Sequence, residues 1–348
     1  MSEISILGIG VICRMGNTVD EIWSNLEKED NIFTEHPLCL FESNMPLAKR
    51  RRANRYSEMG VYVASAAIND AKINIDKLDK DKIGTIFTTG YGPVNSSMAF
   101  AKSISEKDWE SCSPTIFANS VNNTCIGHIC MHLGIRGAST MFMGSNNILY
   151  TQMLFKQNKA DYIITGAIEE YCSPLFDAIC RKKNIPTSYL HEAATAFMTT
   201  SGIVEQAYCV IEKIEECNIG AYPVTNNLFV QDVIKKLEYM YQKISENTVI
   251  DVVLGSTGEN FFDDIEEAVI NKKFSKNVKY VKSVKSIFGE TLGASFNVNI
   301  MVAAICLKKG YLPLRLDRNE TKIRTILVSG YDLSGNYMLA ILKRSEER

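Results

Sequence analysis

The chain has 348 residues, of which 46% are hydrophobic and 22% are charged, and its formal net charge is -2. This composition is typical of a globular protein with a sizeable core, and the balanced charge gives no reason to expect a nucleic-acid or anionic-membrane partner. The ten cysteines contain no CxxC pair, so we expect reduced, buried side chains and a cytoplasmic protein. The first residues carry no basic region, and the longest apolar run, at 300–307, is too short to cross a bilayer. We therefore expect no signal peptide and no membrane span.

Short apolar runs alternate with amphipathic segments along the chain, which is typical of an α/β protein with largely parallel sheets. The first run, at 4–11, predicts a strand, and Thr18 with Glu21 then forms a capping-box pattern before apolar residues at helical spacing. Residues 31–54 read as a polar loop whose basic run, at 49–52, we interpret as solvated surface. Further strands are predicted at 83–89, 139–143, 162–167, 208–214, 249–254, 325–328 and 338–342. Further helices are predicted near 57–71, 122–133, 146–157, 232–244, 262–271 and 292–308.

Several short motifs follow one another along the chain. They are ILGIGV at 6–11, RRANRYS at 51–57, SP at 113–114 with FANSVNN at 117–123, GIRG at 134–137, and KS at 285–286 followed by Gly289 and LGA at 292–294. In this order and spacing they resemble the β-ketoacyl synthase family of the thiolase superfamily, and the resemblance extends, with gaps, over nearly the whole chain.

The resemblance implies an α/β protein with the thiolase-like fold, in which duplicated βαβαβ halves form a layered α-β-α-β-α arrangement. The N-terminal ketosynthase-like half would comprise residues 1–206 and the C-terminal half residues 207–348. No linker rich in proline or glycine separates them, so the halves are expected to pack closely. The resemblance also implies a dimer in which the strand at 139–143 pairs with its counterpart in the partner.

Ketosynthase condensation needs a cysteine thiolate that takes the acyl chain, and two imidazoles that assist decarboxylation and stabilise the developing oxyanion. By the resemblance, the cysteine position falls on Asn146, the first histidine on Gly255 and the second on Glu290, whereas the lysine is retained as Lys285. The glycine-rich loop near the C-terminus is also replaced, at 331–334. An amide cannot form a thioester, so we expect no catalytic residues and no condensation by this chain alone.

The leading hypothesis is therefore a chain-length-factor-type subunit, which is non-catalytic itself and forms a heterodimer with an active β-ketoacyl-ACP synthase. Such a subunit would shape the elongation tunnel of a type II polyketide or aryl-polyene synthase, and it would meet acyl carrier protein through the complex. Asn146 replaces the glutamine common in chain-length factors, which indicates a divergent branch. The candidate interface or tunnel residues are Phe117, Asn119, Met141, Phe142 and Met143, for which ordinary core packing is the alternative interpretation.

Two alternatives remain open. The first is a divergent acyltransferase or hydrolase that uses Ser145, Cys125 or Glu290, although no histidine is obviously placed to activate the serine. The second is a homodimeric module that binds acyl groups or carrier protein without a ketosynthase partner.

No metal and no cofactor are expected. His128 and His132 are spaced i, i+4 on a predicted helix, but no third ligand is evident, so we interpret them as structural. The glycines at 90–92 lack the lysine and the spacing of a phosphate-binding loop, and they are interpreted as a turn that ends a strand.

Overall fold

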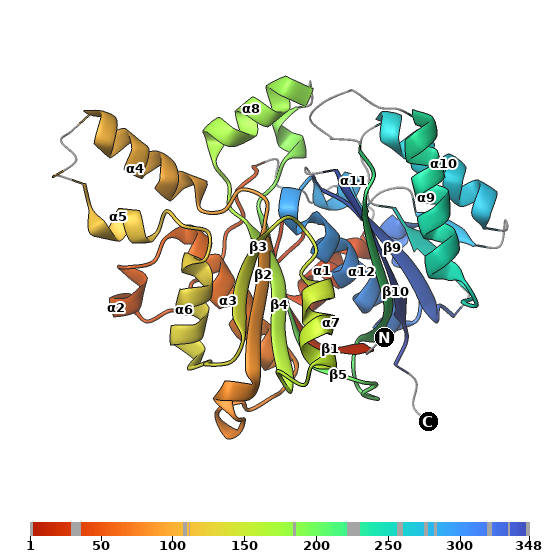
Figure 1. Ribbon diagram of the computed structural model, residues 1–348, viewed down its shortest axis with the longest axis horizontal. Coiled ribbons are helices and arrows are strands. Elements are labelled where there is room, and N and C mark those ends of the chain that lie inside the picture. Colours follow the sequence, from red (N-terminus) through yellow and green to blue (C-terminus); the bar gives the residue numbers. More distant parts are fainter. Residues whose placement is uncertain are drawn as a thin grey trace.

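The strands of the described part of the chain form one ten-stranded sheet in the order β3-β2-β4-β5-β1-β6-β10-β9-β7-β8 (Figure 1). This computed structural model describes residues 3–28, 36–106, 110, 112–183, 186–220, 230–255, 260–274, 278–281, 284–318, 322–332 and 335–345. The strands are β1 (Ile4–Ile12), β2 (Ile83–Thr89), β3 (Ser139–Met143), β4 (Tyr162–Glu169), β5 (Ala193–Ser201), β6 (Cys209–Asn218), β7 (Val252–Leu254), β8 (Lys279–Val281), β9 (Thr325–Tyr331) and β10 (Asn336–Lys343).

The strand order is mirrored about the centre of the sheet. Read outward from the centre, β1-β5-β4-β2-β3 is matched by β6-β10-β9-β7-β8, and the two halves meet where Ile4, Ser5 and Ile6 of β1 pair with β6. This symmetry agrees with a duplicated architecture, and the division between residues 206 and 207 stays a prediction.

The expectation of largely parallel sheets was wrong, because the sheet is mixed. β2 and β7 are parallel to both of their neighbours, whereas β5 is antiparallel to β4 and β1, and β10 is antiparallel to β6 and β9. β5 was not predicted from the sequence. It is rich in alanine and threonine and is buried on both faces through Thr199, so it lacks the alternation that marks a half-exposed strand.

The helices form three layers around the two halves of the sheet. α3 and α6 cover the outer face of the first half, α9 and α10 cover that of the second, and α7 and α12 contact strands of both halves (Figure 1). The layered α-β-α-β-α arrangement expected above is therefore present. The helices are α1 (Val19–Leu26), α2 (Leu47–Arg50), α3 (Arg55–Asp70), α4 (Val94–Glu106), α5 (Pro114–Ala118), α6 (Thr124–Leu133), α7 (Ile148–Lys156), α8 (Ser173–Lys183), α9 (Val230–Ser245), α10 (Asn260–Lys273), α11 (Lys285–Phe288) and α12 (Ser295–Lys309).

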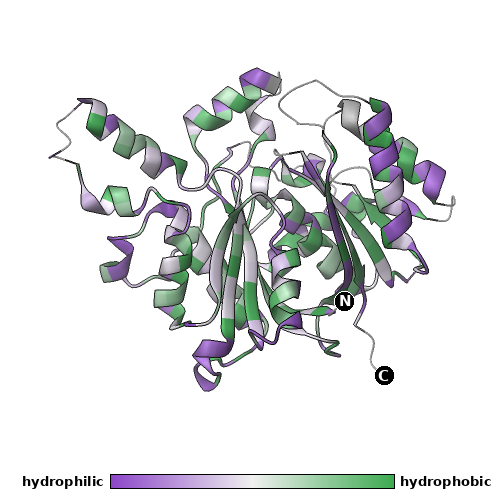
Figure 2. Ribbon diagram, viewed as in Figure 1, coloured by the Kyte–Doolittle hydropathy of each residue, from purple (hydrophilic) through white to green (hydrophobic). Residues whose placement is uncertain are grey.

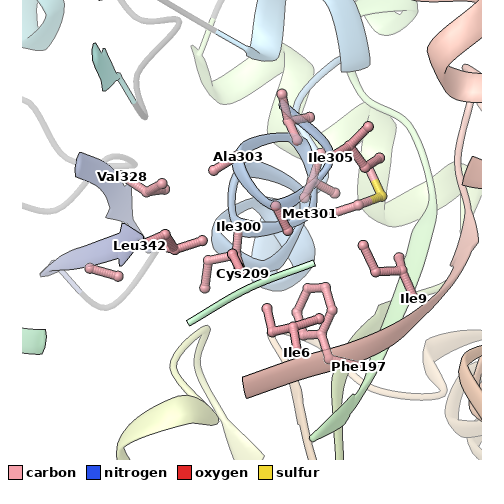
Figure 3. Close-up of a cluster of buried hydrophobic side chains, with 14 of the residues drawn as sticks. Ile6, Ile9, Phe197, Cys209, Ile300, Met301, Ala303, Ile305, Val328 and Leu342 are labelled. Carbon is pink, nitrogen blue, oxygen red and sulfur yellow. The ribbon is translucent and has the colours of Figure 1, made fainter. Parts of the chain in front are cut away.

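α12 is the central helix of the core, and every residue from Ser295 to Leu307 is buried. Burial of an isoleucine or methionine side chain contributes about 1.5–3 kcal/mol to the free energy of unfolding. The packing of this helix therefore stabilises the association of the two halves. Figure 3 shows its apolar side chains surrounded by residues of both halves. The labelled residues are Ile300, Met301, Ala303 and Ile305 of α12, with Ile6, Ile9, Phe197, Cys209, Val328 and Leu342 of five strands.

The stretch Leu292–Lys309 includes α12 and is longer than the apolar run expected from the sequence. Within the described residues it is the one helical stretch long and apolar enough to cross a membrane, and 89% of it is buried inside the protein. The outer helices differ, because they turn one apolar face inward and one hydrophilic face outward (Figure 2). α9, for example, buries Val233, Leu237, Tyr241 and Ile244 at helical spacing.

Two local sequence signals have clear structural causes. The Thr18 hydroxyl accepts a hydrogen bond from the Glu21 N–H at 3.2 Å, which confirms the predicted cap of α1. The glycines of the 6–11 motif allow α3 to lie directly on β1. A Cβ added at Gly10 would meet the Val63 carbonyl oxygen at 1.9 Å, and one at Gly8 would meet the Ala67 carbonyl oxygen at 2.3 Å.

Candidate functional site

The first two turns of α12 link the positions that the sequence comparison assigned to the lost chemistry. Three buried polar side chains at alternate positions bond to three separate segments. Ser295 Oγ bonds to Glu290 Oε1 at 2.7 Å, Asn297 Nδ2 to the Ser145 carbonyl at 3.3 Å, and Asn299 Nδ2 to the Gly255 carbonyl at 3.5 Å. Residues far apart in the sequence therefore converge at one end of the central helix.

Asn146 lies half-buried in the loop between β3 and α7. Its Nδ2 donates to Glu216 Oε2 at 2.7 Å, and its Oδ1 accepts from the Leu149 N–H in the first turn of α7 at 3.4 Å. Both ends of the amide are thus engaged in holding the loop and the helix N-terminus. Neither atom can act as the nucleophile of a thioester-forming enzyme.

Asn147 anchors the same loop to the core. Its Nδ2 donates to Thr165 Oγ1 at 2.7 Å, and its Oδ1 accepts from Asn297 Nδ2 at 3.0 Å. The hydroxyl of Ser145, which precedes the two asparagines of the loop, is buried and has no hydrogen-bond partner among the described residues. A serine nucleophile needs a base within hydrogen-bond reach, so the geometry gives the Ser145 alternative no support.

Glu290, which the motif spacing assigns to the second histidine position, is one half of a buried ion pair. Lys285 Nζ donates to Glu290 Oε2, and the two side chains are 6% and 9% exposed. The other carboxylate oxygen of Glu290 accepts from the Leu292 N–H and from Ser295 Oγ, both at 2.7 Å. The positive charge of Lys285 is therefore compensated by the Glu290 carboxylate.

The structure describes only part of the two other segments that the sequence analysis singled out, at 255–259 and 331–334. Gly255 ends β7, where its N–H donates to the Val281 carbonyl at 2.9 Å, and residues 256–259 lie outside the described residues. At the other replaced loop, Asp332 is buried and accepts from the Asn336 N–H at 3.1 Å, while residues 333–334 lie outside the described residues. Gly255 has no side chain, so it cannot supply the imidazole that the chemistry requires.

Cys125 and the histidines offer no replacement chemistry. Cys125 is fully buried in α6 against Gly60 of α3, and burial raises the pKa of its thiol. Burial lowers the pKa of His128 and His132, and it lowers the pKa of His191 to about 4, so these rings favour the neutral form. Among the described residues, no group of three histidine, cysteine, aspartate or glutamate side chains could hold a metal ion.

The five candidate interface or tunnel residues lie at or near the free edge of the sheet, but they point in different directions. Phe117 and Met143 are 56% and 61% exposed. Met141 packs toward the outer core under α3 and α6, whereas Phe142 packs toward the central core against Tyr150. Asn119 is buried, and its Nδ2 donates to the Arg52 carbonyl at 2.8 Å.

Two acidic residues near the site were not singled out from the sequence. One is Glu216, which is 70 residues from Asn146 in the sequence and contacts it only in the folded chain. The other is Glu169, at the end of β4, whose Oε1 accepts from the Gly90 N–H and from Thr89 Oγ1 beside Gly293. Burial raises the pKa of Glu169 to about 8. A glutamate at the end of an apolar run that predicts a buried strand was the available signal in the sequence.

Glu169 should make the protein less stable as the pH rises. Its unfolded-state pKa is near 4.5 and its folded-state pKa is about 8, so the folded chain binds more protons between these values. The free energy of unfolding then falls by up to about 1.4 kcal/mol per pH unit in this window. We expect Glu169→Gln to flatten this slope, measured by urea unfolding at pH 5.5 and 8. Equal slopes in the two proteins would contradict the assignment.

Comparisons with known proteins agree with this geometry. The family description "Beta-ketoacyl synthase, N-terminal domain" matches residues 39–200, and "Beta-ketoacyl synthase, C-terminal domain" matches residues 220–318. The 3-oxoacyl-(acyl-carrier-protein) synthase 2 of Synechocystis sp. is 25% identical over 196 residues, which cover 50% of this chain and 47% of that protein. The protein of the same description from Staphylococcus aureus strain COL is 23% identical over 189 residues, covering 48% and 45%. This chain thus spans about half the length of the curated relatives it matches.

Solved structures match over nearly the whole chain. A β-ketoacyl synthase from Burkholderia phymatum STM815 has a TM-score of 0.80 at 16% identity and covers 99% of this chain and 100% of that chain. The ishigamide ketosynthase/chain length factor has a TM-score of 0.78 at 17% identity, covering 98% and 99%. A type II PKS acyl-carrier protein in complex with its ketosynthase bound to the hexaketide gives 0.76 at 14% identity, covering 99% of both chains.

The fold is therefore thiolase-like. The chain belongs to the β-ketoacyl synthase family, as the sequence motifs indicated.

Proposed function

We propose that this chain is the non-condensing subunit of a ketosynthase heterodimer, in the manner of a chain length factor. The observation that carries the proposal is Asn146, which the motif spacing assigns to the nucleophile position and whose amide is bonded at both ends, to Glu216 and to the Leu149 N–H. The buried Lys285–Glu290 pair supports it, because the lysine charge is already compensated. The partner would supply the thiolate and both imidazoles.

The free edge of the sheet supports docking of a partner along β3. Among the described residues, β3 pairs with β2 alone, and exposed apolar side chains gather on the chain segments around it. These side chains are Met98, Ile104, Phe117, Val121, Met131 and Met143. A cavity of about 670 Å³ opens beside the strand, between α6 and β3. An unpaired strand edge with apolar surroundings is suited to pairing with another chain.

In the proposed heterodimer this chain limits how far the partner's product can grow. The rings of Phe142 in β3 and Tyr150 in α7 meet edge to face with their centroids 4.9 Å apart, and the loop that carries Asn146 joins these two elements. Bulky side chains in such a position exclude further two-carbon units from a shared chamber. Acyl carrier protein would reach the complex through the active subunit.

Reconstitution tests the proposal. The chain is co-expressed with an intact Cys-His-His ketosynthase, and the purified complex is incubated with acyl carrier protein carrying a labelled acyl group. We expect a stable complex in which intact-protein mass spectrometry finds the acyl adduct on the partner alone. An adduct on Ser145 or Cys125 would favour an acyltransferase or hydrolase. A homodimer that ignores the ketosynthase would favour an acyl-binding or carrier-binding module.

A further inference from the structure

Glu216 projects from β6 toward the loop that carries the nucleophile position. Its Oε2 accepts from Asn146 Nδ2 at 2.7 Å, although 70 residues separate them in the sequence. No lysine or arginine among the described residues forms an ion pair with Glu216, in contrast to its neighbour Glu215, which pairs with Lys243 at 2.7 Å. The loop therefore faces a carboxylate whose charge no described cation compensates.

A second carboxylate approaches the same loop from the turn between β9 and β10. A side chain added at Gly144 would place its Cβ 3.5 Å from Asp332 Oδ2. The charge of Asp332, together with burial, raises the pKa of Glu216, so the two carboxylates lie close enough to interact. The Asn336 N–H and side-chain amide both donate to Asp332 and fix its orientation.

The N-terminus of α7 gives these carboxylates an electrostatic role. A helix N-terminus carries partial positive charge and favours a negative group, and a thiolate at position 146 would use this field. Here Asn146 Oδ1 caps the Leu149 N–H while Asn146 Nδ2 binds Glu216. The asparagine thus connects the positive helix end to a carboxylate that already provides the negative charge.

We propose that Glu216, together with Asp332, is a specificity-determining residue whose negative charge repels anionic groups from the nucleophile position. Acyl donors that carry a free carboxylate, such as malonyl-type groups, are repelled from the loop, whereas neutral and cationic groups are admitted. This inference rests on the proposed function and deepens it, and it implies that a cysteine placed at position 146 would not by itself restore condensation. The charge selectivity is a property of the isolated chain, and the experiment below measures it on the isolated chain.

Charge-selective labelling provides the test. In Asn146→Cys, the rate of thiol modification is measured at one pH with three methanethiosulfonate reagents, which are anionic, neutral and cationic. Peptide mass spectrometry assigns the label to position 146 and separates it from the native cysteines. A unit charge about 5 Å away at a partly exposed site changes such rates about tenfold. We therefore expect the cationic reagent to react about tenfold faster than the anionic one, and the rate of the neutral reagent serves as the reference for both.

Two double variants decide whether Glu216 causes the selectivity. Adding Glu216→Gln should lower the cation-to-anion ratio severalfold toward one, and Asp332→Asn should lower it less. Glu215→Gln is the matched control, because adjacent strand residues face opposite sides of the sheet, and it should leave the ratio unchanged. If Asn146→Cys does not fold, Leu149→Cys is labelled instead, since this side chain is 37% exposed and its substitution keeps the Asn146–Glu216 bond.

An unchanged ratio on adding Glu216→Gln, or faster reaction of the anionic reagent with Asn146→Cys, would overturn the inference. Neither result depends on a ketosynthase partner. A failure of the proposed heterodimer would appear as loss of complex formation with the charge selectivity intact, so the two failures are distinguishable.

Discussion

Glu290→Ala should lower the free energy of unfolding by about 3–5 kcal/mol, because it leaves the ammonium group of Lys285 buried without its carboxylate. The change also removes the acceptor of the Leu292 N–H and of Ser295 Oγ, so two further buried donors lose a partner. Urea unfolding followed by circular dichroism measures the effect at pH 7.

Two controls separate charge from packing. Glu290→Gln keeps an acceptor oxygen for Leu292 and Ser295 but removes the charge, so its loss should reflect mainly the unpaired lysine. The double variant Lys285→Met, Glu290→Met replaces the ion pair by apolar side chains and should recover most of the stability, because neither member then leaves a buried charge. If Glu290→Ala cost less than about 1 kcal/mol, as exposed pairs do, the pair could not be the buried contact described above.

Met141→Pro should abolish association with a ketosynthase partner while leaving the chain folded. The Gly144 N–H donates to Thr89, and the Ala138 carbonyl accepts from Thr85, so even-numbered residues of β3 bond to β2. The N–H of Met141 therefore faces away from β2, toward the free edge. Proline removes that N–H and blocks strand addition without breaking the ladder to β2.

Met141→Ala is the matched variant, because it removes the same side chain and keeps the N–H. We expect it to retain the complex, whereas Met141→Pro weakens association at least a hundredfold, measured by sedimentation velocity of the co-expressed pair. Similar unfolding midpoints of the two variants would show that the loss arises at the edge. A complex that tolerates proline at this position would place the docking surface elsewhere.

The features that were predictable from the sequence are those with local causes. The cap at Thr18, the glycines that bring α3 onto β1 and the apolar stretch of α12 each leave a pattern within a few residues. The ordered motifs then gave the family, and numbering along them gave Asn146, Gly255 and Glu290. β5 was missed because burial on both faces removes the alternation that reveals a strand.

The environment of the candidate site was not predictable, because its contacts join distant segments. Nothing near Asn146 in the sequence indicates that a glutamate on β6 will bond to it. The five-residue separation of Lys285 and Glu290 is likewise not a helical pairing distance, and their contact depends on the turn at Gly289, where φ is +79°. Such pairs are set by topology and register rather than by local pattern.

The central position of α12 also has a consequence for how the protein is made. The inner surface of the first half, with Ile6, Ile9 and Phe197, is covered by a helix that begins at Ser295, nearly 300 residues after β1. During synthesis the first half emerges long before this cover exists, so its apolar inner face stays open to other chains. Contacts of such large sequence separation form slowly, so we expect this surface to be a binding site for chaperones during synthesis.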